Sequence, residues 1–126
     1  MKKLLVSLSA LFVSFNAFSA TINQELKKAL IVTVKAQPGK GDQALNYLAG
    51  LSPLKIVDKE KGTKTWYIVR FDKDTFYVFD TFKNDEGREA HIAGEIPKAV
   101  NAKPDLFLPL EVKKVDVILS AKPKKQ

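Results

Sequence analysis

Residues 65–82 read TWYIVRFDKDTFYVFDTF, two runs of β-branched and aromatic residues around the polar sequence Asp72-Lys73-Asp74. Two runs of this composition with a short polar turn between them are typical of a β-hairpin. We therefore predict one strand at residues 65–71 and a second strand at residues 75–82.

The second strand of this hairpin is largely apolar on both faces. One face presents Phe76, Val78, Asp80 and Phe82, and the other presents Tyr77, Phe79 and Thr81. A sheet that is covered by helices on one face only should alternate apolar and polar residues, because its second face meets water. No other part of the sequence remains to cover that second face. The pattern predicts a homodimer in which a second copy covers it; the alternative is a half-exposed apolar face.

The segments upstream of the hairpin are one strand and one helix. Residues 30–35 are apolar and β-branched and are followed by Pro38-Gly39, which predicts a strand. Residues 40–48 have apolar side chains at helical spacing, which predicts a helix. Residues 54–57 fit either a short helix or an extended piece.

The segments downstream of the hairpin repeat this order. A helix is predicted to begin at an N-cap formed by Asn84 or Asp85 and to run to about residue 99, with Pro97 kinking or shortening its end. A fourth strand is predicted at residues 112–121. The order β-α-β-β-α-β predicts an α+β, ferredoxin-like fold, an antiparallel sheet with both helices on one face.

The N-terminus has the pattern of a signal peptide. Lys2 and Lys3 precede an apolar run at residues 4–15, and small residues follow at the two candidate cleavage sites, after Ser19 or after Ala20. The run is shorter than the roughly 20 residues that cross a bilayer. We predict a signal peptide at residues 1–20 and a single domain at residues 21–126 in the periplasm or secreted, without stable membrane insertion after cleavage. The alternatives are an uncleaved anchor and a buried core segment.

Composition excludes several kinds of site. The chain has no cysteine, so it has no disulfide, thiolate metal site or cysteine nucleophile. With a single histidine and scattered carboxylates, no metal-ligand spacing is recognisable, and no glycine-rich phosphate loop is present. We therefore expect no metal and no cofactor. The net charge is +7, but aromatic residues do not interleave with a basic stripe, so no nucleic-acid partner is expected. The basic tail at residues 122–125 is either simply solvated or weakly attracted to an anionic membrane.

His91 is the only histidine and the first candidate for chemistry. On the predicted helix it shares a face with Arg88 and Glu95. A side chain that titrates near neutral pH suits the deprotonation of a phenol or quinol, and a purely catalytic His91 should tolerate replacement by alanine with little change in melting temperature. The alternative is a structural histidine that fixes the helix to the sheet.

Asp80 interrupts an apolar strand, and a buried carboxylate needs a partner. Arg88 or His91 is the candidate partner, either to orient a catalytic base or as a structural salt bridge. Three aromatic side chains, Trp66, Phe76 and Phe82, are candidates to line an apolar pocket for a planar substrate, or are simply core.

Several segments resemble the antibiotic biosynthesis monooxygenase family. They are residues 62–66, the strand at 76–82, the helix at 86–94 with its Arg-x-x-His pattern, the ending at 115–119 and the turn at 38–40. The resemblance covers roughly residues 29–121. It implies a dimeric α+β barrel and a relationship to cofactor-free oxygenases of polyketide and quinol aromatics. The Trp-to-His spacing of the haem-degrading members is not found, and residues 51–61 are shorter and more charged than the usual loop of the family.

These observations leave different classes of function open. The resemblance implies an exported cofactor-independent monooxygenase that acts on a small aromatic or quinol. The alternatives are a non-catalytic binding protein for a small hydrophobic ligand such as a quinone, and an envelope protein that recruits a partner through its sheet. The sequence does not decide whether the protein is an enzyme, nor which substrate it takes.

Overall fold

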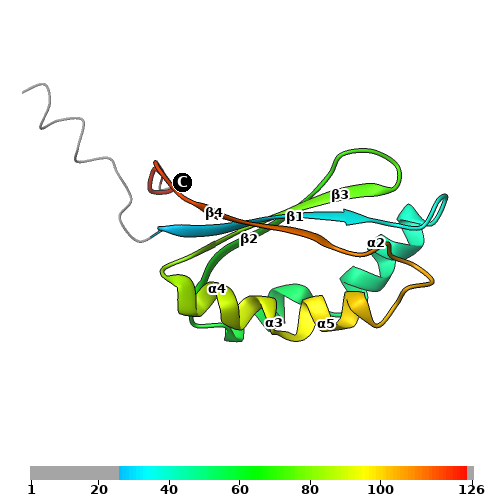
Figure 1. Cartoon of the computed structure of the whole chain (residues 1–126), viewed down its shortest axis with the longest axis horizontal. Helices are drawn as coiled ribbons and strands as arrows, with labels where there is room; N and C mark the ends of the chain where they lie inside the picture. Colours follow the sequence, from blue (N-terminus) through cyan, green and yellow to red (C-terminus); the bar gives the residue numbers. More distant parts are fainter. Residues whose placement is uncertain (1–25, 125–126) are drawn as a thin grey trace, which may run out of the picture. The chain divides into compact units, whose positions relative to one another are not determined.

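The computed structural model describes residues 26–124, and its folded unit is an antiparallel sheet with helices on one face (Figure 1). The strands are β1 (Lys28–Lys35), β2 (Thr63–Arg70), β3 (Thr75–Phe82) and β4 (Glu111–Asp116), in the order β2-β3-β1-β4. The helices are α2 (Gly41–Gly50), α3 (Pro53–Lys59), α4 (Asp85–Ile92) and α5 (Glu95–Asn101). This arrangement confirms the predicted α+β, ferredoxin-like fold.

The unit that carries this sheet extends to Val117, and residues 118–124 lie outside it. The predicted signal peptide at residues 1–20 lies outside the described residues. Within residues 26–124, no helix combines the length and apolar character that crossing a membrane requires.

The hairpin of β2 and β3 forms as predicted. The last strand, β4, is shorter than predicted, because its partner strand, β1, limits the length of β4. We predicted a strand at 112–121, but β4 ends at Asp116. It is an edge strand that pairs only with β1, and Asp116 lies opposite Lys28, the first residue of β1. One more backbone bond follows, from the Val117 N–H to the Lys27 carbonyl at 2.9 Å, and the pairing with β1 then ends; Ile118 is 82% exposed.

The predicted second helix is two helices, α4 and α5. Asn84 caps α4 as predicted, since its Oδ1 accepts a hydrogen bond from the Gly87 N–H at 3.0 Å. The helix closes where the Gly94 N–H donates to the His91 carbonyl at 2.9 Å. Gly94 then serves as the N-cap of α5, so Pro97 lies in the first turn, where a missing N–H leaves no helical bond unmade. The piece at 54–57, left open by the sequence, is helical and belongs to α3.

The core lies between the helices and one face of the sheet. The cross-strand register places Leu30, Asp80 and Trp66 side by side, because Asp80 pairs with Leu30 on β1 and with Trp66 on β2. The buried apolar side chains on this face pack against α2 and α5. A single carboxylate is therefore built into the middle strand of an apolar layer, facing the helices.

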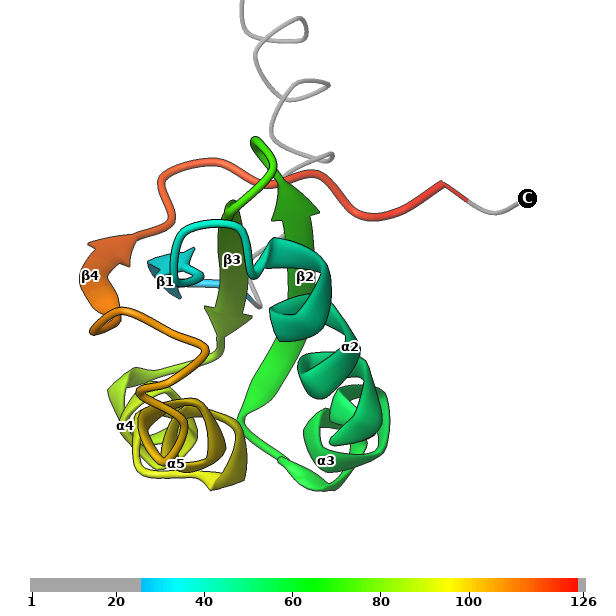
Figure 2. The ribbon, with the colours of Figure 1, turned by 90° about the vertical axis from the view of Figure 1, so that its right-hand side faces the viewer.

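The opposite face of the sheet is open in the single chain. Figure 2 shows the helices as two pairs, α2 with α3 and α4 with α5, both on the same side of the strands. Apolar side chains remain on the other side, and Tyr67 is 57% exposed. Its neighbours there are Ile31, Val69 and Phe79, all exposed.

Candidate functional site

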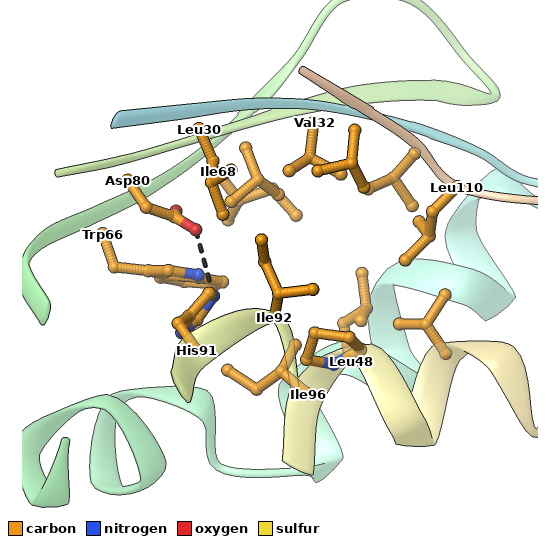
Figure 3. A pocket seen from close by; sticks show the side chains of 15 residues that line it. Leu30, Val32, Leu48, Trp66, Ile68, Asp80, His91, Ile92, Ile96 and Leu110 are labelled. Atoms are coloured by element: carbon orange, nitrogen blue, oxygen red, sulfur yellow. Dashed lines mark ion pairs between the residues drawn. The ribbon is translucent and has the colours of Figure 1, made fainter. Parts of the chain in front are cut away.

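A small cavity lies between the sheet and the helices (Figure 3). Its volume is about 60 Å³. Aliphatic side chains from β1, β2, β3, α2, α4 and α5 form most of its wall, together with the indole of Trp66. The charged groups on the wall are Asp80 and His91. The cavity is therefore an apolar space with one polar corner.

Asp80 and His91 contact each other at this corner. Asp80 projects from β3 and is 0% exposed, and His91, in the last turn of α4, is also buried. Their contact joins Nε2 of the histidine and Oδ2 of the aspartate at 3.0 Å (Figure 3). The structure therefore brings together the two residues that the sequence singled out, and His91 is the partner of Asp80.

Glu60 is a third member of this group and was not predicted. Its carboxylate accepts from Nδ1 of His91, at 2.9 Å through Oε1 and 3.0 Å through Oε2. Glu60 follows the last residue of α3 and is 31 residues away in sequence from His91. The only sequence signal for it was the general one that a buried histidine needs partners for both ring nitrogens.

The backbone lets Glu60 reach α4 because two glycines meet. A Cβ on Gly62 would lie 2.5 Å from the Cα of Gly87. The turn after α3 therefore packs directly on the first turns of α4. This close approach holds the Glu60 carboxylate at the imidazole.

The two carboxylates determine the charge of His91. Burial alone lowers the pKa of His91, but the contacts with Asp80 and Glu60 outweigh it, and the pKa is raised above 6.5. Only the imidazolium carries an N–H on both nitrogens, so it is the form that satisfies both carboxylates. Burial raises the pKa of Asp80 above its ordinary value, and the contact with His91 opposes that rise.

Two polar groups at this corner have unused hydrogen-bonding capacity. Oδ2 of Asp80 has the 3.0 Å contact with His91, whereas among the described residues Oδ1 of Asp80 and the Nε1–H of Trp66 have no hydrogen-bond partner. Buried polar groups are normally paired. Because both side chains line the cavity, they present one acceptor and one donor to whatever occupies it.

Arg88 lies away from the cavity. Its guanidinium donates to the Val115 carbonyl at 3.1 Å and pairs with Asp85 at 2.8 Å. It fixes α4 to the edge of the sheet at β4. The structure therefore does not bring Arg88 to Asp80, the pairing that the sequence left open.

The three aromatic candidates do not all line the cavity. Trp66 lines the cavity, whereas Phe76 and Phe82 do not. Phe82 packs against the imidazole of His91, with ring centroids 5.6 Å apart, and Phe76 lies under the guanidinium of Arg70. Both phenylalanines are fully buried core residues. Within residues 26–124, no cluster of three or more histidine or acidic side chains is placed to hold a metal ion.

Comparison with known proteins places this site in a structural context. No family model and no curated protein matches the sequence. The crystal structure of a protein of unknown function from Nitrosomonas europaea is 33% identical, with 82% of this chain and 100% of that chain covered and a TM-score of 0.74.

More distant matches carry a family name. Proteins named as putative antibiotic biosynthesis monooxygenases are known from Nitrosomonas europaea and Chloroflexus aurantiacus. The first is 14% identical over 72% of this chain and 98% of that chain, with a TM-score of 0.61. The second is 17% identical over 73% of this chain and 93% of that chain, with a TM-score of 0.55. At these identities the likeness concerns the fold, and it confirms that the resemblance seen in the sequence extends to the fold.

Proposed function

The chain belongs to one family with the protein of unknown function from Nitrosomonas europaea and has the fold of the antibiotic biosynthesis monooxygenases. From this premise we propose that it is a cofactor-independent monooxygenase of a small hydroxyaromatic or quinol. The observation that carries the proposal is the polar corner of the cavity. There a buried carboxylate with a free oxygen, Asp80, lies against the imidazolium of His91.

Asp80, rather than His91, is the proton acceptor in this proposal. Both nitrogens of His91 contact carboxylates, so the imidazolium has no lone pair to offer. Asp80 keeps an oxygen without a partner and can take the proton of an acidic hydroxyl while its other oxygen stays at Nε2. The raised pKa of Asp80 makes it a stronger base than an exposed carboxylate. The indole N–H of Trp66 is then a donor for the oxyanion that remains.

The ionised substrate then reacts with dioxygen. A ring carbon that carries two hydrogens in the keto form of the substrate becomes a carbonyl carbon. One oxygen atom of O₂ enters that carbonyl, and the other leaves as water with the two hydrogens. The substrate therefore supplies all four electrons, and the reaction needs no flavin, nicotinamide or metal.

The size of the cavity restricts the substrate. An engineered cavity of about 150 Å³ in another protein admits benzene, and this cavity is about 60 Å³. An aromatic ring therefore enters only when the wall of the cavity expands. We infer a substrate whose reacting end is a single ring.

The proposal includes a homodimer outside the cytoplasm. The exposed apolar face with Tyr67 and Phe79 supports a second copy packed on the sheet. The predicted signal peptide at residues 1–20 supports export to the periplasm or secretion. In those compartments an oxygenase that needs only substrate and O₂ has an advantage over one that needs a soluble reduced cofactor.

A second candidate function is a non-catalytic binding protein for a small hydrophobic ligand such as a quinone. One observation favours it: His91 has both ring nitrogens occupied by carboxylates, as a purely structural histidine would have. In this case the Nε1–H of Trp66 would donate to a ligand carbonyl and no proton would move.

Oxygen consumption by the purified protein with a panel of hydroxyaromatics and quinols tests the proposal. Asp80→Asn, which keeps the shape of the side chain, should lower turnover by roughly 10²–10⁴-fold, the contribution of a general base. The exposed carboxylate of Asp42 provides the control, because Asp42→Asn changes charge away from the cavity. Full activity in Asp80→Asn would contradict the role of Asp80. Stabilisation of the wild-type protein by a quinone without any oxygen consumption would favour the binding protein.

A further inference from the structure

A second hollow lies on the other side of the His91 imidazole from the cavity. It is a groove between α3 and α4 with a volume of about 300 Å³. Glu60 lines this groove, and the side chain of Glu60 is 21% exposed. The imidazole of His91 therefore lies between a carboxylate that meets solvent and a carboxylate that meets the cavity.

We propose that Glu60 is a positioning residue of the site: it holds His91 doubly protonated against Asp80, and it carries the proton of His91 to and from solvent in the groove. This inference deepens the proposed function, since it concerns the charge of the group that faces Asp80. It rests on two contacts, 2.9 Å from Nδ1 to Glu60 and 3.0 Å from Nε2 to Asp80.

The proton exchange follows from these contacts. The Nδ1 proton of the imidazolium passes to the Glu60 carboxylate, which leaves a neutral imidazole and a neutral glutamic acid. The glutamic acid then gives the proton to water in the groove, and the reverse steps restore the imidazolium. His91 itself is 4% exposed, so Glu60 is its contact with the solvent-exposed groove.

The backbone around Glu60 keeps it in this position. The Glu60 N–H donates to the Val57 carbonyl at 2.9 Å and ends α3. On the helix side, a Cβ added to Gly94 would lie 3.6 Å from Oε2 of Glu60, so the end of α4 packs against the carboxylate. These contacts restrict the Glu60 carboxylate more than a side chain on an open surface is restricted.

Other charged groups surround this arrangement. Lys59, Lys61 and Glu95 line the groove with Glu60. On α4, Arg88 precedes His91 by one turn but is directed to the carbonyls of Ala29 and Val115. From β3 the facing group is Asp80. Among these groups, the carboxylates of Glu60 and Asp80 are the ones in contact with the imidazole.

Because His91 is the only histidine, its imidazole signals in a nitrogen-15 NMR spectrum report this site directly. In Glu60→Gln the amide oxygen still accepts from Nδ1, so the contact persists without a charge. We expect the pKa of His91 to fall and the exchange of its Nδ1 proton with water to slow by roughly 10²-fold, the lower end of what a positioned proton acceptor contributes. Glu95→Gln, a change in the same groove away from His91, should alter neither quantity. Glu60→Asp, which retains a carboxylate, should keep a higher pKa than Glu60→Gln.

An unchanged pKa and exchange rate in Glu60→Gln would overturn the inference, as would equal effects of Glu95→Gln. The measurement needs no substrate. If no hydroxyaromatic is oxidised by the wild-type protein, the proposed oxygenase fails while the NMR result still decides the role of Glu60. If oxidation is found, Glu60→Gln should shift the pH profile of turnover to lower pH with little change in melting temperature.

Discussion

Replacing His91 by alanine should strongly destabilise the protein. The substitution leaves Asp80, which is 0% exposed, without its cation, and it also removes the partner of Glu60. Breaking a buried ion pair by removing one member costs about 3–5 kcal/mol. For a domain of this size, 1 kcal/mol corresponds to about 4–8 °C in melting temperature, so we expect a fall of roughly 12–40 °C.

The expected loss depends on pH in a defined direction. Without His91, the buried Asp80 can relieve its penalty only by protonation. Its pKa is already raised by burial, so the folded state binds this proton more tightly than the unfolded state does. The stability associated with the neutral form is therefore complete at pH below 3.8 and is lost as pH rises through the folded-state pKa. The difference between wild type and His91→Ala should be larger at pH 6, where His91 is still protonated in the wild type, than at pH 4.

Thermal melts followed by circular dichroism at several pH values measure this directly. The double variant Asp80→Asn/His91→Ala is the matched control, because it removes the buried charge as well as its partner. It should be more stable than His91→Ala alone at neutral pH. A melting temperature of His91→Ala within about 2 °C of wild type would refute the reasoning, and it would agree with the purely catalytic histidine that the sequence left open beside the structural one.

Three further predictions concern pH, packing and assembly. Because the pKa of His91 is raised, its stabilising effect is complete below pH 6.5 and is lost as pH rises through the higher folded-state value; urea unfolding between pH 6 and 9 should show this step, and His91→Gln should remove it. Gly62→Ala should cost about 1–3 kcal/mol by overpacking against Gly87, whereas Gly50→Ala, which meets open space, should not destabilise; a greater loss in Gly50→Ala would contradict this. Phe79→Lys on the open sheet face should convert the proposed dimer to a monomer in light scattering, and Leu54→Lys on α3 should not; an unchanged mass in Phe79→Lys would exclude this face.

The fold was predictable because its signals are local. The hairpin at 65–82 and the strand at 75–82 follow from residue composition and a short turn, and Asn84 caps its helix through a contact three residues away. The errors arose where a contact with another segment, rather than local sequence, determines where a strand or helix ends. The length of β4 depends on where β1 begins, and the break between α4 and α5 depends on Gly94 serving as a cap, which a helical pattern running through it does not reveal.

The site was predictable only in part, because its contacts join distant segments. Asp80 stood out as a charge in an apolar strand, and His91 as the single histidine one helix later. Glu60 lies between Lys59 and Lys61 in a charged turn, and nothing in the neighbouring sequence marks it as a partner of His91. Its role depends on the approach of Gly62 to Gly87, a tertiary contact.

We propose for the polar corner a role beyond a structural tie between helix and sheet. A buried ion pair whose only function is structural gains most when every acceptor and donor is satisfied, and a well-packed apolar replacement is often at least as stable. Here Asp80 and Trp66 keep polar atoms without aligned partners, and both line the same cavity. Unsatisfied buried groups reduce stability, so a chain that retains them next to an apolar space has the features of a binding site. In the proposed arrangement, Glu60 controls the charge of His91 from the groove between α3 and α4, away from the cavity. Substrate access and proton exchange can then occur on different sides of one histidine.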